Sequence, residues 1–284
     1  MRFRDPAGVV DEMEYWYKLG YRQFSFLDDN FNASRKRVYA ICDEIRSRGL
    51  RDLFLRCLGA RADKLDNHML KKMKEAGFKT VAIGVEVGND KMLAVIRKGE
   101  KFEDIDRAVK EACNLGYDVY LNFLAGVPYE TLSDIADSIN FAQKYPIFYA
   151  AWSNIIPYPG TELYDWLSQK NYLLKEPDEY LNDDSDDSDI PVFMTPELSF
   201  DTRRKILRHL KHVTQNILRR GILLRLEQHG VKWGLRHIIS YLASHDTLSK
   251  FLFQNPIRRL ADSIRFRLYM KSGRAKSRMP SSSA

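Results

Sequence analysis

The sequence predicts an α/β protein whose parallel sheet curves into a partial barrel, followed by an α-helical C-terminal region. Short apolar segments alternate with amphipathic segments in units of about 30 residues, which indicates parallel strands joined by helices. Gly20, Gly49, Gly77 and Gly116 each end an expected helix shortly before an expected strand. Polar residues follow the strands at their carboxyl ends, and this pattern favours a barrel over a doubly wound sheet.

Capping residues and hydrophobic spacing define the expected elements. Asp5 and Pro6 begin the first helix, and Asn32 or Ser34 begins the second, which extends to residue 48. Residues 81–89 are a largely apolar run in which Glu86 lies near the end, which predicts a strand buried on both faces with a carboxylate at its exit. Strands are expected at 23–27, 53–58, 79–86, 117–124 and 148–156, and further helices at 65–76, 90–97, 103–115, 131–144 and after 161.

Length and composition suit one large α/β domain with an appendage. The 284 residues are 44% hydrophobic and contain no run of about 18 apolar residues, and the N-terminal sequence is not a secretory signal. Cys42, Cys57 and Cys113 are far apart, so they predict neither a disulfide framework nor a C-x-x-C metal site. We therefore expect a cytoplasmic protein.

Charge is unevenly distributed along the chain. Residues 1–195 hold 26 Lys and Arg against 33 Asp and Glu, whereas residues 196–284 hold 19 against 5. Basic segments of this kind bind nucleic acid, an anionic membrane or an acidic partner. The chain has no RNA-binding aromatic motif and no zinc pattern, so specific nucleic-acid binding is not expected. The basic helices are expected to pack on the barrel or to lie on a membrane surface, which would make the protein peripheral to the membrane.

Four regions are predicted along the chain. The acidic run at 182–189 lacks the spacing and the glycine of a calcium loop, so it is interpreted as a solvated loop. C-terminal helices are expected at 199–220, at 222–243 with a break at Gly230, and at 246–270. The regions are a partial barrel at 1–174, an acidic loop or linker at 175–198, a basic helical region at 199–270 and a disordered tail at 271–284.

The candidate binding residues are the polar groups at the strand ends. Carboxylates accept hydrogen bonds from an ammonium group or from hydroxyls, and Arg or Lys pairs with a carboxylate. A ligand that carries an amine, a carboxylate and ribose hydroxyls would use such groups. No histidine follows a strand, and no Ser-His-Asp or Cys-His arrangement is indicated. The strand-end groups are Asp28, Asp29, Asn30, Arg61, Asp63, Glu86, Asn122, Gly126, Pro128, Asn154 and Pro157.

Five segments carry a family resemblance when they are taken in order. They are Asp-Asp-Asn-Phe at 28–31, Arg-Ala-Asp at 61–63, Gly-Val-Glu-Val-Gly-Asn at 84–89 with Lys-Gly at 98–99, Phe-Leu-Ala-Gly-Val-Pro-Tyr-Glu-Thr at 123–131, and Pro-Tyr-Pro-Gly-Thr-Glu-Leu-Tyr at 157–164. Together they resemble the radical SAM superfamily, and most of all the branch whose members carry a cobalamin-binding domain ahead of the radical SAM domain. The resemblance extends over residues 4–169.

This resemblance implies a six-stranded partial barrel in which a 4Fe–4S cluster binds S-adenosylmethionine and cleaves it reductively to a 5′-deoxyadenosyl radical. The family positions fall on the strand ends of this chain. The resemblance places Asp28, Asp29 and Asn30 at the methionine amino group, Glu86 at the ribose, Lys98 or Arg61 at the carboxylate, the backbone of Gly126 to Pro128 near the adenine, and Asn154 on the substrate side.

The chain departs from the family pattern in three respects. Val87 stands where Ser is more common, and Tyr129 stands where a small Gly is usual. The cluster motif C-x-x-x-C-x-x-C is absent, and the three cysteines are interpreted as buried apolar groups. If 23–27 is the family's second strand, the first strand and its cluster loop lie upstream of Met1. We therefore predict a truncated rather than a degenerate domain that holds no cluster by itself and exposes a strand edge at 23–27.

Two functions remain open from the sequence. In the first, the chain is the C-terminal portion of a radical SAM enzyme for a small-molecule or lipid-like substrate. That enzyme would cleave S-adenosylmethionine or, with an upstream cobalamin-binding domain, transfer a methyl group. In the second, the chain is a degenerate, non-catalytic barrel module that binds a nucleotide-like ligand or a partner protein. Fold analogy does not identify the substrate.

Overall fold

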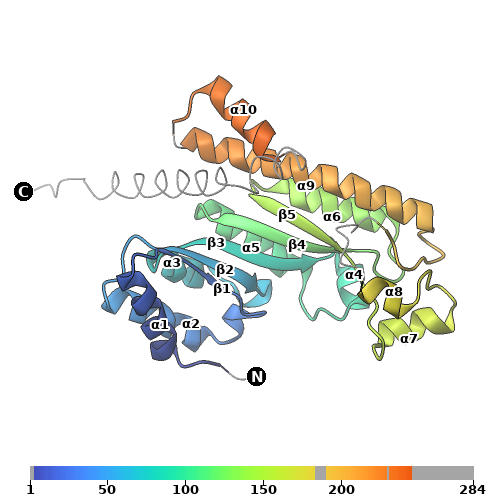
Figure 1. The fold of residues 1–284 in the computed structure, drawn as a ribbon, viewed down its shortest axis with the longest axis horizontal. Coiled ribbons are helices and arrows are strands. Elements are labelled where there is room, and N and C mark those ends of the chain that lie inside the picture. The colour runs from blue at the N-terminus through green and yellow to red at the C-terminus, as the bar shows by residue number, and fades with distance from the viewer. Residues whose placement is uncertain (1–2, 183–189, 229, 245–284) are drawn as a thin grey trace, which may run out of the picture.

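The computed structural model describes residues 3–182, 190–228 and 230–244 (Figure 1). Its centre is a single sheet of five strands in the order β1-β2-β3-β4-β5, and every neighbouring pair is parallel. The described sheet therefore has its strands in chain order, which confirms the predicted α/β fold with a partial parallel barrel. The strands are β1 (Gln23–Phe26), β2 (Phe54–Ala60), β3 (Phe78–Glu86), β4 (Asp118–Ala125) and β5 (Tyr149–Asn154).

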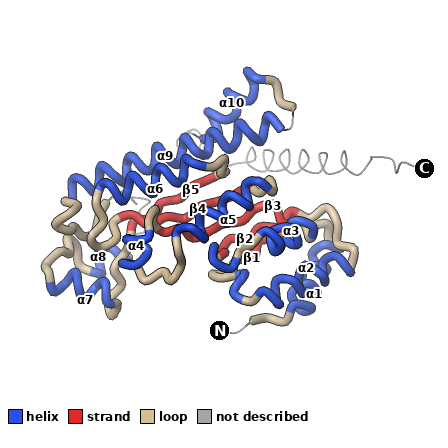
Figure 2. Tube along the Cα trace, turned by 180° about the vertical axis from the view of Figure 1, so that it is seen from behind, coloured by secondary structure: helices blue, strands red, loops and turns tan. Residues whose placement is uncertain are grey.

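Helices connect each strand to the next and extend the chain beyond the sheet (Figure 2). Asp5 accepts a hydrogen bond from the Gly8 N–H at 3.1 Å, and Ser34 rather than Asn32 caps the second helix by accepting from the Arg37 N–H at 3.3 Å. The α-helices are α1 (Pro6–Lys18), α2 (Arg35–Ser47), α3 (Asn67–Glu75), α4 (Asp90–Val95), α5 (Phe102–Asn114), α6 (Leu132–Lys144), α7 (Glu162–Gln169), α8 (Pro177–Leu181), α9 (Phe200–Gln228) and α10 (Trp233–Ser244).

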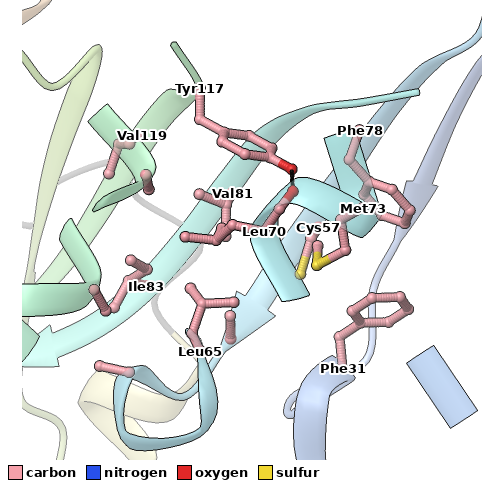
Figure 3. Packing of buried hydrophobic residues seen from close by; sticks show 14 of the residues in the cluster. Phe31, Cys57, Leu65, Leu70, Met73, Phe78, Val81, Ile83, Tyr117 and Val119 are labelled. Atoms are coloured by element: carbon pink, nitrogen blue, oxygen red, sulfur yellow. Dashed lines mark hydrogen bonds between the residues drawn. The ribbon is translucent and has the colours of Figure 1, made fainter. Parts of the chain in front are cut away.

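The main hydrophobic core lies between one face of the sheet and helices α2, α3 and α5 (Figure 3). Alternate strand residues such as Cys57, Val81 and Val119 are fully buried in it. Burial of a large apolar side chain stabilises the fold by roughly 1.5–3 kcal/mol, so the many buried side chains of this core contribute strongly to stability. Tyr117 reaches the core with its ring, and its hydroxyl donates to the Leu70 carbonyl at 2.6 Å, which satisfies the one polar atom of the side chain.

The opposite face of the sheet opens toward the carboxyl ends of the strands. In β3, Ala82 is buried, but Gly84 and Glu86 are partly exposed, and Asn122 of β4 is exposed. As predicted, β3 is buried along most of its length and ends on a partly exposed carboxylate. Its exit is open because glycine and polar side chains stand here in place of the bulky branched residues that fill a closed barrel.

The C-terminal region is helical, as predicted, but the helix boundary differs. α9 runs without a break through Gly221, where the sequence predicted a boundary between two helices. A Cβ at Gly221 would lie 2.7 Å from the Phe148 carbonyl oxygen, so this glycine allows α9 to pack closely on the start of β5. The predicted break at Gly230 is confirmed by its φ of 70° and by the end of α9 at Gln228. The features expected at 183–189, 246–270 and 271–284 lie outside the described residues.

Candidate functional site

The carboxyl ends of the parallel strands form one edge of the sheet, and α4, α7 and α8 lie at the same end of the molecule (Figure 1). In the loop after β1, Asp28 forms an ion pair with the Arg37 guanidinium, with 3.1 Å between Oδ1 and Nη2, and the Arg37 side chain is only 8% exposed. Asn30 is half-buried, whereas Asp29 is exposed and makes no ion pair within the described part of the chain. Asp28 thus has a structural partner, and Asp29 is the carboxylate that faces solvent.

The end of β2 is fixed by two sets of contacts around Arg61. The buried Asn32 side chain accepts from the Arg61 N–H at 2.9 Å and donates to the Arg61 carbonyl at 2.8 Å, which joins the loop after β1 to β2. The Arg61 guanidinium donates to both oxygens of Asp63, at 3.0 and 3.1 Å, and lies 3.2 Å from the buried Glu100 carboxylate. The hydrogen bonds that Arg61 donates to Asp63 raise the pKa of Arg61. Protein carboxylates therefore already neutralise this guanidinium.

Glu86 ends β3 in the left-handed conformation, with a φ of 66°. A non-glycine residue adopts this conformation at a cost of roughly 1–3 kcal/mol, and such residues cluster at functional sites. The Glu86 side chain folds back over Gly84, where a Cβ would lie 2.6 Å from Glu86 Oε1. Lys98 Nζ lies 2.9 Å from the same oxygen. The Glu86 side chain is 23% exposed and the Lys98 side chain 17% exposed. The structure thus joins two predicted binding residues in a half-buried ion pair on the open face of the sheet.

The loop after β4 holds a buried carboxylate to which the sequence assigned no role. Glu130 is fully buried, and its Oε2 accepts from the N–H groups of Gly126 at 2.6 Å and Val127 at 3.3 Å. Arg203 of α9 is 2% exposed and donates to the Gly126 carbonyl at 3.2 Å. Burial raises the pKa of Glu130 to about 7 and lowers the pKa of Arg203 to about 10, while the attraction between the two charges opposes both shifts.

The two substituted positions of the family pattern take different places. Val87 is 1% exposed and belongs to the main core, so it lies on the side of the loop away from the open face. Tyr129 has a φ of 62°, a conformation in which glycine is least strained, and this explains why a small Gly suits the position. The Tyr129 ring is half exposed and lies 5.4 Å from the Trp166 ring, measured between centroids.

Asn154, at the end of β5, lies beside the loop after β4. Its Nδ2 donates to the Ile190 carbonyl at 3.5 Å, and its Oδ1 has no hydrogen-bond partner among the described residues. Gly126 and Arg203 line a cavity of about 10 Å³ together with Asn154, and a cavity of this size holds a single water molecule. Asn154 therefore belongs to the buried contacts between the sheet and α9.

A much larger cavity, of about 920 Å³, opens at the carboxyl ends of β4 and β5. Pro128 and Tyr129 line it from the loop after β4, and Trp166 lines it from α7. Arg97 and Glu162 also line it and are joined by two hydrogen bonds, of 2.9 and 2.8 Å. Small-molecule sites are commonly mostly apolar cavities of about 300–1,000 Å³ with a few polar groups, so this cavity has the size and lining of a ligand site.

The sequence reasoning missed Glu130 and Arg203. Glu130 stands in a segment that the family resemblance already singled out, four positions after Gly126, which is a short enough spacing for its carboxylate to cap the loop. Arg203 left no local signal, because its contact with Gly126 spans 77 positions. Of the predicted residues, Glu86 pairs with Lys98 and Gly126 lies beside Asn154, whereas Asp28 and Arg61 are each bound to other protein side chains.

The described residues do not fit an iron–sulfur cluster. Cys42 and Cys57 are buried and Cys113 is half-buried, on α2, β2 and α5 respectively. Burial raises the pKa of each thiol to about 12, whereas a cluster is held by grouped thiolates. Within residues 3–182, 190–228 and 230–244, no three His, Cys, Asp or Glu side chains are grouped closely enough to hold a metal ion.

The parallel sheet, its polar strand ends and the cavity over β4 and β5 define an α/β domain with a candidate ligand site. The family model of the radical SAM superfamily matches residues 1–142, and the chain belongs to this superfamily. An uncharacterized methyltransferase of Pyrococcus horikoshii is 34% identical over 167 residues, and the anaerobic magnesium-protoporphyrin IX monomethyl ester cyclase of Cereibacter sphaeroides is 27% identical over 169. Each alignment covers 58% of this chain but only 36% and 28% of the relative, so the chain spans about a third of their length.

Solved structures share the fold. The cobalamin-dependent S-adenosylmethionine radical enzyme OxsB aligns with a TM-score of 0.54 and 15% identity, over 88% of this chain and 45% of its own. The radical S-adenosylmethionine methyltransferase TsrM from Kitasatospora setae, with cobalamin and a [4Fe-4S] cluster bound, aligns with a TM-score of 0.53 and 23% identity, over 59% of this chain and 32% of its own. These similarities concern the course of the backbone.

Proposed function

We propose that the chain supplies the S-adenosylmethionine-binding face of a radical SAM enzyme. Together with a cluster-binding part, that enzyme would cleave S-adenosylmethionine reductively to a 5′-deoxyadenosyl radical or carry out cobalamin-dependent methyl transfer. The observation that carries the proposal is the half-buried pair of Glu86 and Lys98, because Lys98 directly follows Arg97, which lines the large cavity. Membership of the superfamily and the methyltransferase and cyclase relatives support it.

Each polar group of the proposed ligand has a candidate partner at this edge. The Glu86 carboxylate would accept hydrogen bonds from the ribose hydroxyls, with Lys98 holding it in position. Lys98 is also the better candidate of the two cations for the methionine carboxylate, since it pairs with one carboxylate, whereas Arg61 is bound by both Asp63 and Glu100. The exposed Asp29 is the carboxylate available to the methionine amino group, because Asp28 is paired with the buried Arg37.

The adenine would be held by packing rather than by hydrogen bonds to the loop after β4. The N–H groups of Gly126 and Val127 already donate to Glu130, and the Gly126 carbonyl accepts from Arg203. The Pro128 ring lines the large cavity and offers an apolar surface. We therefore assign the contact with the base to Pro128. The Gly126 backbone would hold Pro128 in place.

Calorimetric titration of the full chain with S-adenosylmethionine tests this function. We expect measurable binding to the wild-type chain and binding weakened by about tenfold or more in Glu86→Gln, because a charge-assisted hydrogen bond becomes a neutral one. Glu103→Gln is the matched control, since Glu103 is exposed on α5 and should leave binding unchanged. No detectable binding, or equal binding by the wild type and Glu86→Gln, would contradict the proposal.

A parallel titration with adenosine separates this function from that of a nucleotide-binding module. We expect S-adenosylmethionine to bind more tightly than adenosine, because adenosine lacks the methionine part that Lys98 and Asp29 would contact. Replacing Lys98 with Met should then weaken the binding of S-adenosylmethionine more than that of adenosine, because Lys98 would contact the methionine part directly and the ribose only through Glu86. Equal affinities for both ligands would favour the non-catalytic module instead.

A further inference from the structure

The last described helix packs with an inverted arrangement of polar and apolar side chains. On α10, Ser240 is fully buried and Ser244 is 8% exposed. Its large apolar side chains instead point outward, with exposed fractions of 55% for Leu235, 59% for Ile238 and 49% for Tyr241. A helix on a globular protein normally buries its apolar face, so the outward apolar side of α10 requires something to cover it.

α10 is held by two contacts with α9 and by a hydrogen bond within its own last turns. Arg236 pairs with Glu227 of α9 at 3.0 Å, and the Arg219 guanidinium of α9 lies 5.5 Å from the centre of the Tyr241 ring. The Ser240 hydroxyl donates to the His237 carbonyl at 3.0 Å. The contacts with α9 orient α10 and leave Leu235 and Ile238 outward.

α9 adds exposed cations to the outer surface of the C-terminal region. Of its eight Lys and Arg, four are exposed, and all four lie in the N-terminal half of the helix, whereas α10 contacts the C-terminal half. Arg204, Arg208 and Lys211 fall at the spacing of one helix face. In both views α10 lies on the far side of α9 from the sheet (Figures 1 and 2). The outer surface of the C-terminal region is therefore apolar on α10 and cationic on α9.

We propose that α9 and α10 dock the protein on an anionic lipid surface, with the apolar side of α10 in the interface and the α9 cations at the headgroups. Exposed Leu, Ile and Tyr side chains beside Arg and Lys are the composition of helices that lie in the membrane interface. Within the described residues, no helix is long and apolar enough to cross a bilayer, so this contact is peripheral. The charge pattern selects phosphatidylserine-like lipids over neutral ones.

Co-sedimentation of the full chain with lipid vesicles tests this docking. We expect at least about tenfold more binding to phosphatidylserine-containing vesicles than to pure phosphatidylcholine vesicles, and a loss of binding as salt concentration rises. Replacing Leu235 and Ile238 together with Asn should abolish binding. Leu19→Asn is the matched control, because Leu19 is 59% exposed at the C-cap of α1 and lies away from α10.

The variants also separate lipid docking from contact between proteins. Both substitutions lie at exposed positions, so circular dichroism and thermal melting of the double variant should match the wild type. Equal binding to the two vesicle types, or unchanged binding by the double variant, would overturn the proposal. Sedimentation velocity provides a further test. A wild-type dimer that the same double substitution converts to a monomer would also overturn the proposal, because a second copy of the chain would then cover α10.

Discussion

Arg203 in α9 donates a hydrogen bond to the carbonyl of Gly126 across 77 positions of the chain, at a distance of 3.2 Å. Glu130 binds the N–H of the same glycine, so the loop after β4 is held from both sides by buried charged groups. One of these groups belongs to the basic helical region and the other to the barrel. The shape of the loop that we propose to contact adenine is therefore coupled to the position of α9.

Replacing Arg203 with Met tests this coupling. The substitution keeps an unbranched side chain but removes the donor to Gly126 and the positive charge near Glu130, so we expect the free energy of unfolding to fall by about 3 kcal/mol. Urea denaturation measures the change. Arg204→Met is the control, because Arg204 is exposed one position away and its loss should cost less than about 0.5 kcal/mol. Similar losses in both variants would contradict a specific role for Arg203.

The buried carboxyl of Glu130 predicts a pH dependence of stability with a definite sign. Burial raises its folded-state pKa from the ordinary value of 4.5 to about 7, so the folded protein binds this proton more tightly than the unfolded chain does. Its contribution to stability is therefore fully present below about pH 4.5 and is lost as the pH rises through 7.

Denaturation of the wild type and of Glu130→Gln across this range measures the effect. We expect the stability of the wild type relative to the variant to fall by up to about 3 kcal/mol between about pH 5 and pH 8, since each pKa unit corresponds to about 1.4 kcal/mol. Glutamine keeps the size of the side chain and does not titrate in this range. Parallel stability curves for the two proteins would show that the folded-state pKa of Glu130 is not raised.

Local sequence signals predict the order of strands and helices as far as α7, but not α8, which lies at Pro177–Leu181 in the segment expected to be a loop or linker. Ser34 and Gly116 are examples, because a hydroxyl at a helix start and a glycine at a helix end act within a few residues of their own position. Gly221 shows the limit of such signals. A glycine inside a helical pattern marks either a boundary or a close contact, and only the approach of the Phe148 backbone decides between them.

The sequence predicts which residues lie near the site but not which side chains contact one another. The strand ends follow from the parallel topology, which predicts Glu86 at this edge, whereas only the family resemblance predicts Lys98 there. Which charges pair with one another depends on the three-dimensional arrangement. The sequence contains no sign that Arg37 forms an ion pair with Asp28. Arg203 could not be found for the same reason, since it comes from a helix that the barrel pattern does not include.

Gly59 provides a test of how closely β2 approaches the loop after β1. A Cβ at this position would lie 2.7 Å from the Asp29 carbonyl oxygen and closer still to that of Asp28. Because backbone atoms cannot move aside as a flexible side chain can, we expect Gly59→Ala to lower the free energy of unfolding by about 2 kcal/mol or more. Thermal melting and urea denaturation report the loss.

Gly8 supplies the opposite expectation and serves as the control for Gly59. It lies within α1, and a Cβ there would have its nearest neighbour 4.0 Å away. Gly8→Ala should therefore stabilise the protein by roughly 0.5–1 kcal/mol, since alanine is the better helix former. A Gly59→Ala variant as stable as the wild type would mean that the loop carrying Asp28 and Asp29 is free to shift.

Anaerobic reconstitution of the chain with iron and sulfide should give no stable 4Fe–4S absorbance and no cluster EPR signal after reduction. Cys42, Cys57 and Cys113 lie on three different elements, and thiols whose pKa is raised to about 12 stay protonated at neutral pH. Replacing all three cysteines with alanine is the control for adventitious iron, and it should leave the small amount of bound iron unchanged. A stable cluster signal in the wild type that disappears in the triple variant would show that the cysteines come together as ligands. The loop after β1 and the core around Cys57 would then have to rearrange from the packing described here.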